Sequence, residues 1–152
     1  MNFSANRDII NSGGEKVDKI PEVEQRLNTF NDLNNRSIAR YLENMGRVTI
    51  ANKLEGVPGA GRQGDAFVDG VKTEFKTLSP NAGPNTIKND VNNSIRGGGQ
   101  ARRIVFDARN TLLTKEEAEQ GIFKALGISR GKIDFIEVIG NDYFFGYAPK
   151  EK

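Results

Sequence analysis

The sequence predicts an α/β fold in which a mixed β-sheet is flanked by helices. Apolar residues recur every three or four positions in three separate regions, which is the spacing of a helix that buries one face. Short β-branched or alternating runs lie between these regions, and two of the runs flank the pair Asp69-Gly70. The predicted order is helix, three strands, helix, strand, helix and two strands, without an internal repeat. A mixed sheet covered by helices is the economical architecture for this order.

Residues 1–20 are polar and contain the run Ser12-Gly13-Gly14. We interpret them as a linker or a loosely packed lead-in, followed by a single domain over residues 21–152. The domain opens at Pro21, a favourable residue for the first turn of a helix. Its first helical region carries apolar residues at Val23, Leu27, Phe30, Ile38, Leu42 and Met45, and Gly46 is expected to cap it.

Local signals predict the remaining elements. Asp69-Gly70 favours a tight hairpin turn with positive φ angles, within residues 64–77. Thr114 and Glu117 form a capping box for a helix that stops at Gly127. The other expected elements are strands at 47–54, 104–106, 133–139 and 143–147, and a helix at 86–96.

Composition limits the chemistry that the chain can perform. The 152 residues are 36% hydrophobic and 28% charged, which is typical of a soluble globular domain. No cysteine and no histidine are present, so catalysis must use carboxylates, lysine, arginine, tyrosine or hydroxyls. The net charge is only +2, so an anionic partner must meet a local basic patch. No run approaches the ~20 apolar residues of a membrane span, and we expect no export signal in the chain itself.

The second arm of the hairpin has an unusually charged face. Alternation places Lys72, Glu74 and Lys76 on one side of this strand, and Asp65 begins the partner arm. Hydrolysis of a phosphodiester with Mg²⁺ needs carboxylate oxygens for the metal and a cation for the attacking water or the developing charge. We predict that Asp65 and Glu74 bind Mg²⁺ and that Lys76 serves as this cation. The alternative is a solvent-facing hairpin with cross-strand ion pairs.

A further carboxylate is expected near this site. Glu43, at the edge of the first helical region, is one candidate for it, and Glu55 competes for the same role. The other interpretation of Glu43 is a solvated helix position. Asp69 is assigned to the turn and left out of the site.

A second group of residues is basic. Lys88, Arg96, Arg102 and Arg103 surround the helix at 86–96 and the entry to the next strand, and they could hold phosphates together with Lys72. Gln100 could orient a phosphate, a base or Lys76, or it could be structural. The basic stripe is equally consistent with a solvated helix face. The aromatic residues Tyr143, Phe144, Phe145 and Tyr147 could stack on RNA bases, but core packing is the expected role.

These residues resemble a known family. The run from Leu54 to Leu78, the segment Thr86-Ile-Lys-Asn and the segment from Gln100 to Arg109 are similar to C-terminal toxin domains of contact-dependent growth inhibition proteins of the CdiA type. The group that they resemble comprises tRNases with a restriction-endonuclease-like, PD-(D/E)XK fold. Asp65-x8-Glu74-x-Lys76 resembles the motif of this fold, although Gly64 stands in place of the motif's proline.

The resemblance implies a function beyond the residues themselves. It implies a nuclease that cleaves tRNA in the cytoplasm of a target bacterium, and export as the C-terminal part of a larger surface protein. It also implies a cognate immunity protein that blocks the active site. Asp65, Glu74 and Lys76 would be catalytic, with Glu43 and Gln100 as additions.

Three other functions remain open from the sequence. A DNase could use the same motif, because the motif does not distinguish the sugars. An RNase could instead use the 2′-hydroxyl of its substrate as the nucleophile, without a metal. A non-catalytic binding or immunity module is the third, although such a module has no need for clustered Asp, Glu and Lys on one strand face. The cleaved position and the tRNA subset do not follow from the sequence.

Overall fold

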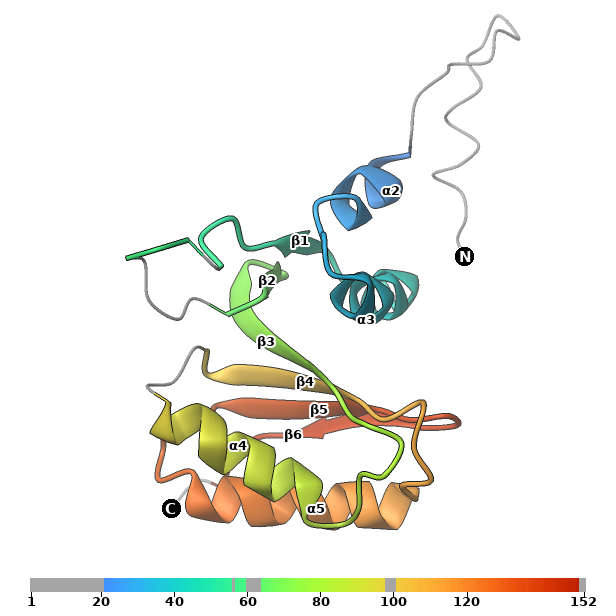
Figure 1. Ribbon diagram of the computed structural model, residues 1–152. Coiled ribbons are helices and arrows are strands. Elements are labelled where there is room, and N and C mark those ends of the chain that lie inside the picture. The colour runs from blue at the N-terminus through green and yellow to red at the C-terminus, as the bar shows by residue number, and fades with distance from the viewer. Residues whose placement is uncertain (1–20, 56, 60–63, 98–100, 151–152) are drawn as a thin grey trace, which may run out of the picture.

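The computed structural model describes residues 21–55, 57–59, 64–97 and 101–150. Within these residues, six strands form one mixed sheet in the order β1-β2-β3-β4-β5-β6. Helices cover both faces of the sheet, with α2 and α3 on one side and α4 and α5 on the other (Figure 1). The predicted α/β class and mixed sheet are therefore confirmed.

The helices predicted at 86–96 and after Thr114 begin and end close to the predicted positions, whereas the first helical region forms two helices, the second of which is capped by Asp32. The bounds are α2 Glu22–Leu27, α3 Leu33–Asn44, α4 Thr86–Arg96 and α5 Lys115–Ile128. The capping box of α5 is present, with the Thr114 hydroxyl accepting from the Glu117 amide at 3.1 Å and the Glu117 carboxylate accepting from the Thr114 amide at 3.0 Å. Gly46 follows α3 with a φ of +88°, a conformation that glycine adopts without steric cost.

The strands predicted at 47–54, 133–139 and 143–147 are shorter in the structure, whereas the strand predicted at 104–106 is one residue longer at each end. Their bounds are β1 Thr49–Ala51, β2 Ala66–Val68, β3 Val71–Thr77, β4 Arg103–Asp107, β5 Phe135–Ile139 and β6 Phe144–Tyr147. The first run, predicted at 47–54, contributes only three residues to the sheet, because its partner β2 is itself only three residues long.

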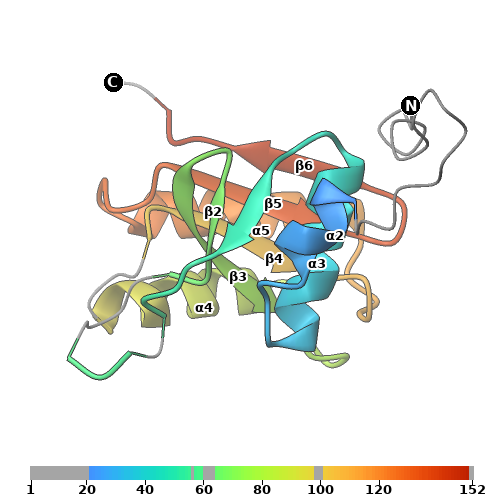
Figure 2. The same cartoon turned by 90° about the horizontal axis from the view of Figure 1, so that it is seen from above.

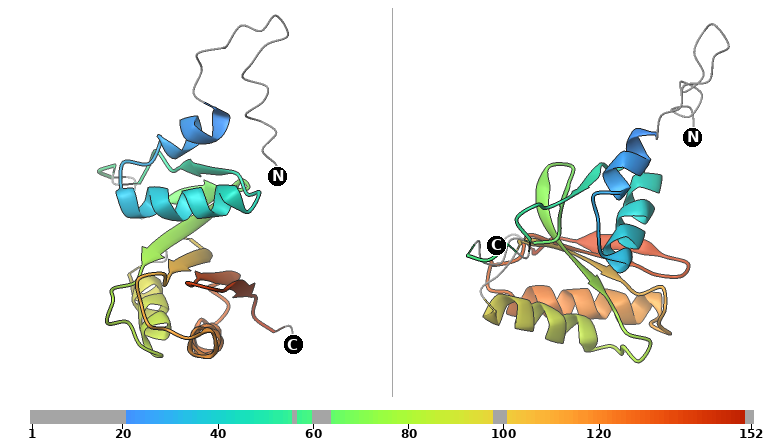
Figure 3. Two further views of the ribbon diagram at one scale, coloured as in Figure 1. Left: turned by 90° about the vertical axis from the view of Figure 1, so that its right-hand side faces the viewer. Right: turned by 45° about the horizontal axis from the view of Figure 1, so that its top comes forward.

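The strand directions change across the sheet. β1, β2 and β3 pair antiparallel, β3, β4 and β5 pair parallel, and β5 and β6 pair antiparallel. Asp69 and Gly70 connect β2 to β3 with φ angles of 49° and 82°, as the turn requires. The parallel steps need crossover helices, and α4 and α5 provide them on the same face (Figure 3).

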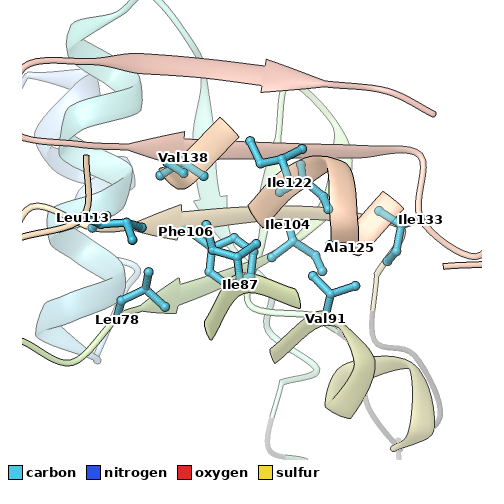
Figure 4. Close-up of a cluster of buried hydrophobic side chains, with 13 residues drawn as sticks. Leu78, Ile87, Val91, Ile104, Phe106, Leu113, Ile122, Ala125, Ile133 and Val138 are labelled. Atoms are coloured by element: carbon cyan, nitrogen blue, oxygen red, sulfur yellow. The ribbon is translucent and has the colours of Figure 1, made fainter. Parts of the chain in front are cut away.

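Two apolar cores lie on opposite faces of the sheet. The larger core packs α4 and α5 on β4 and β5 around Ile87, Ile104, Phe106 and Ile122, which are at most 1% exposed (Figure 4). The smaller core packs α2 and α3 on the other face of the sheet. Figure 2 shows these two helices from above. Phe75 contributes to the smaller core, so Glu74 and Lys76 on either side of it point toward α4.

The C-terminal aromatic residues take part in this packing. Tyr143, Phe145 and Tyr147 pack against the larger core, and Phe144 forms an edge contact with Tyr41 of α3. Their packing role, expected from the sequence, is observed.

Candidate active site

Asp65 lies at the edge of β3, immediately before β2 begins. Its backbone amide donates to the carbonyl of Thr73 at 3.0 Å. Its side chain takes the place of a backbone acceptor on β2, because Oδ2 accepts a hydrogen bond from the backbone amide of Phe75 at 2.8 Å. These two bonds fix the Asp65 carboxylate beside Phe75 of β3, which lies between Glu74 and Lys76 in the strand.

The carboxyl groups of Asp65 and Glu55 lie in hydrogen-bond contact. Burial raises the pKa of Asp65, and contact with Glu55 adds to this effect, whereas the Phe75 amide and Asn35 of α3 oppose it. The resulting pKa of Asp65 is about 6. Glu55, rather than Glu43, is therefore the second carboxylate that the fold places beside Asp65.

Glu74 lies in the interior, under α4. Its residue is 3% exposed, and its Oε1 accepts a hydrogen bond from the Ser94 hydroxyl at 2.7 Å. Burying a carboxylate costs free energy unless polar partners replace the lost water. The Ser94 bond offsets part of this cost and fixes the orientation of the carboxylate.

Lys76 follows two positions along the same strand face and faces Asp90 of α4. Asp90 is half-buried, and its burial raises its pKa, while the nearby Lys76 charge lowers it by a smaller amount. Ser94 and Asp90 are four residues apart on α4, which matches the two-residue step from Glu74 to Lys76 on β3. The helix thus supplies a hydrogen-bond donor for Glu74, through Ser94, and a nearby acidic side chain for Lys76, through Asp90.

Glu43 lies elsewhere. Its carboxylate forms a bidentate pair with Arg26, at 2.7 and 2.8 Å, and accepts the backbone amide of Thr49 at 2.8 Å. Its side chain is 3% exposed. Asn35, which contacts Asp65, lies eight positions earlier on α3, or ~12 Å along the helix axis. These contacts give Glu43 a role in joining α2, α3 and β1.

The structure separates the predicted basic group. Lys88 and Arg96 line a groove between α4 and the end of α5. Arg102 is paired with Asp134, and Arg103 is paired with Glu137 and stacks over Phe135. Lys72 is exposed on β3, opposite Phe67 of β2. Gln100 lies outside the described residues.

Carboxylate oxygens are the ligands that Mg²⁺ prefers. Asp65 and Glu55 lie in contact, and Glu74 lies on the adjacent strand β3, with its carboxylate against Ser94 of α4. The contact between Asp65 and Glu55 concentrates negative charge, which a divalent cation would neutralise. Among the described residues, no group of three or more acidic side chains is already arranged around a common point. A cation held by Asp65, Glu55 or Glu74 would therefore need further ligands, such as water or substrate oxygens.

Sequence reasoning missed Ser94, Asp90 and Asn35. Ser94 and Asp90 flank the apolar stripe of α4, and this position beside a buried helix face is the sequence pattern that could have identified them. Only the crossover from β3 through α4 to β4 shows that this side of the helix covers Glu74 and Lys76. Asn35 reaches Asp65 from α3, thirty residues away in sequence, at 3.4 Å.

Comparisons with known proteins agree with this architecture. The family model for the contact-dependent growth inhibition CdiA C-terminal domain matches residues 62–143, more than half of the chain. The fold is similar to a solved CdiA-CT/CdiI toxin and immunity complex from Burkholderia pseudomallei, with a TM-score of 0.60 and 19% sequence identity. The similarity covers 86% of this chain and 94% of the other. A search among curated proteins found no match.

None of the helices in the described part of the chain is long and apolar enough to cross a bilayer.

Proposed function

Since the chain belongs to the CdiA C-terminal domain family of contact-dependent growth inhibition, we propose that it is a toxin nuclease that hydrolyses phosphodiester bonds of tRNA. The observation that carries the proposal is the arrangement at the edge of β3. Asp65 binds the Phe75 amide there, while Glu74 and Lys76 emerge on either side of Phe75 with partners on α4.

Each residue of this site has a distinct role in the proposal. Asp65 and Glu74, with Glu55 as the additional carboxylate, would hold a hard divalent cation such as Mg²⁺. When bound, the cation supplies Lewis-acid activation of a phosphoryl oxygen and of water. Lys76 orients the attacking water or stabilises negative charge on the phosphoryl oxygens.

Supporting residues hold these groups in place. The Phe75 amide donates a hydrogen bond to Asp65, and the Ser94 hydroxyl donates one to Glu74. Hydrogen bonds of this kind reduce the reorganisation that a site must undergo as charge develops.

The substrate and the partner are proposed from the family. The resemblance of the run from Leu54 to Leu78 to tRNase toxin domains supports tRNA as the substrate. The solved relative in fold is described as a toxin and immunity complex, which supports a cognate immunity protein for this chain. In this proposal the domain is exported as the C-terminal part of a larger surface protein and acts in the cytoplasm of the target cell.

Incubation with two substrates tests the activity. Purified protein is incubated with total tRNA and with supercoiled plasmid, each with Mg²⁺ and with excess chelator. Cleavage of tRNA alone, lost with chelator and restored by Mg²⁺, is the expected result. Cleavage of plasmid instead would assign a DNase, and chelator-resistant cleavage of tRNA would assign a mechanism that uses the 2′-hydroxyl. An intact tRNA and plasmid in all four reactions would contradict the proposal.

A further inference from the structure

The groove between α4 and the end of α5 is basic throughout. It encloses about 770 Å³ and is lined by four cationic side chains, those of Lys88, Arg96, Arg130 and Lys132, together with neutral residues that include Asn89 and Asn92. No carboxylate is among the residues that line it. Figure 3 shows the two helices side by side on the face of the sheet that carries the larger core.

The cations of the groove lack the partners that other arginines of the chain have. Six described arginines form ion pairs with Asp or Glu. Within the described part of the chain, the side chains of Lys88, Arg96, Arg130 and Lys132 have neither an ion pair nor a hydrogen bond. Four positive charges thus meet in one groove without neutralisation, and such a surface attracts a polyanion.

The backbone at Arg130 is held in an unusual conformation. Arg130 has a φ of 52°, in the left-handed region that glycine occupies more easily than other residues. The following turn is fixed by Arg102, which donates to the carbonyl of Gly131 and pairs with Asp134 at 3.0 Å. Arg102, predicted from the sequence to bind phosphate, thus supports the turn that carries Arg130 and Lys132.

The groove and the candidate active site lie on different sides of α4. Successive helix residues turn by about 100°, so Asp90 and Ser94 face β3 while Lys88, Asn92 and Arg96 face α5. The helix between the two sides is ~10 Å across. A duplex strand advances about 3.4 Å per phosphate, so an RNA must extend roughly three phosphates beyond the cleaved bond to reach the groove.

We propose that this groove binds the phosphate backbone of the RNA substrate at a distance from the cleaved bond. The proposal rests on the nuclease function and adds a second contact surface, made by Arg130 and Lys132 with Lys88 and Arg96. It gives the catalytic centre a preference for RNA longer than about four nucleotides, since only such a substrate reaches both surfaces.

A charge-matched pair of double variants tests the groove. Arg130→Gly with Lys132→Gln removes two charges from the groove, and glycine relieves the left-handed backbone, so the fold is expected to be retained. Lys115→Gln with Lys124→Gln removes two charges from exposed positions of α5 that do not line the groove. Circular dichroism and thermal melting verify that both proteins are folded.

Binding of a labelled tRNA is measured by fluorescence anisotropy at several salt concentrations, with Glu74→Gln added to each protein. The groove variant is expected to bind about tenfold more weakly at 150 mM salt, and the slope of log affinity against log salt concentration should be smaller by roughly 1.4 to 1.8. The charge-matched control is expected to change affinity less than twofold. Equal affinities and slopes for the two double variants would overturn the proposal.

Kinetics without the Glu74→Gln change separate the groove from the catalytic centre. The groove variant is expected to show a higher KM for tRNA with an unchanged kcat, and normal cleavage of a four-nucleotide RNA that is too short to reach the groove. Equal losses on both RNAs would contradict a distant contact. If the parent protein cleaves no RNA, the nuclease proposal fails, while the anisotropy titration still decides whether the groove binds RNA.

An acidic protein is the competing occupant of the groove. Its signature would be weaker binding of the immunity partner by the groove variant, with tRNA affinity equal to that of the control. That result would overturn the RNA proposal.

Discussion

Asp65 is the residue at which function and stability are expected to conflict. Its carboxyl group is half-buried and contacts that of Glu55, so ionisation of both groups brings two negative charges together. The same contact supplies the oxygen ligands of the proposed cation site. A fold selected only for stability would have no reason to keep an acid here.

Replacing Asp65 with Asn is therefore expected to stabilise the protein while abolishing cleavage. The amide oxygen can still accept from Phe75, and the amide NH₂ can donate to Glu55. The folded-state pKa of Asp65 is raised to about 6. The folded protein therefore loses stability relative to the unfolded chain as the pH rises from the ordinary pKa of an aspartate through 6. After allowance for solvent screening, the gain at pH 7 is on the order of 1 kcal/mol, or a few degrees in Tm.

Thermal melting at pH 7 and pH 4 checks this expectation. The difference in Tm between Asp65→Asn and the parent protein should be present at pH 7 and small at pH 4. A variant that melts lower than the parent at pH 7 would show that the two carboxyl groups do not repel each other in the folded protein.

Ser94 is expected to matter through Glu74. Ser94→Ala removes one hydrogen-bond donor from a carboxylate that is 3% exposed, and a hydrogen bond to a charged group is worth about 1.5–3 kcal/mol. We expect a lower free energy of unfolding and weaker tRNA cleavage. Asn93→Ala, at the exposed neighbouring position of α4, is the matched control and should change neither. Denaturant titration and cleavage rates measure the two effects, and equal behaviour of the two variants would refute this role of Ser94.

At the scale of elements, the pair of Arg26 and Glu43 joins α2 to α3 and β1. Burial alone would raise the pKa of Glu43, but the bonds from Arg26 and Thr49 outweigh it, and the pKa lies below its usual value. The Glu43 carboxylate therefore stabilises the fold at neutral pH. This stability is lost as the pH falls below the ordinary glutamate pKa of about 4.3 and through the lower pKa of Glu43 in the folded protein.

Glu43→Gln should thus destabilise the protein at pH 7 by about 1–3 kcal/mol and make its stability less dependent on acid. Denaturant titrations between pH 3 and pH 7 measure this difference, which should shrink as the pH falls. The fraction of tRNA cleaved by folded variant protein should equal that of the parent. A loss of cleavage in fully folded Glu43→Gln would return Glu43 to the active site.

The elements differ in how far their sequences predicted them. The Asp69-Gly70 turn, the α5 capping box and the alternation of β3 depend on neighbouring residues, and the structure confirms all three. The short extent of β1 depends on the length of its partner strand, and the side of α4 that faces β3 depends on the crossover. Such long-range pairings leave no local pattern.

For the whole molecule, the candidate site combines predictable and unpredictable parts. Asp65, Glu74 and Lys76 could be identified from the sequence as candidate site residues, because charged side chains along one face of a central strand and at the start of its partner are unusual. Glu55 could not be preferred over Glu43, since both are single acids near an element end. The separation of Lys88 and Arg96 from Arg102 and Arg103 follows from the placement of α4 and β4, which charge clustering in the sequence does not reveal.

Asp65, Glu74 and Lys76 are proposed to form the nuclease centre for tRNA. Cleavage of total tRNA in Mg²⁺ is compared for the parent protein, for Glu74→Gln and for Lys76→Ala, with Glu116→Gln on the exposed side of α5 as a control for loss of a carboxylate. We expect cleavage by the parent and the control, and a loss of at least about a hundredfold, on the order expected for removing one electrostatic group, in both site variants. Cleavage that survives both site substitutions in folded protein would rule out this nuclease centre.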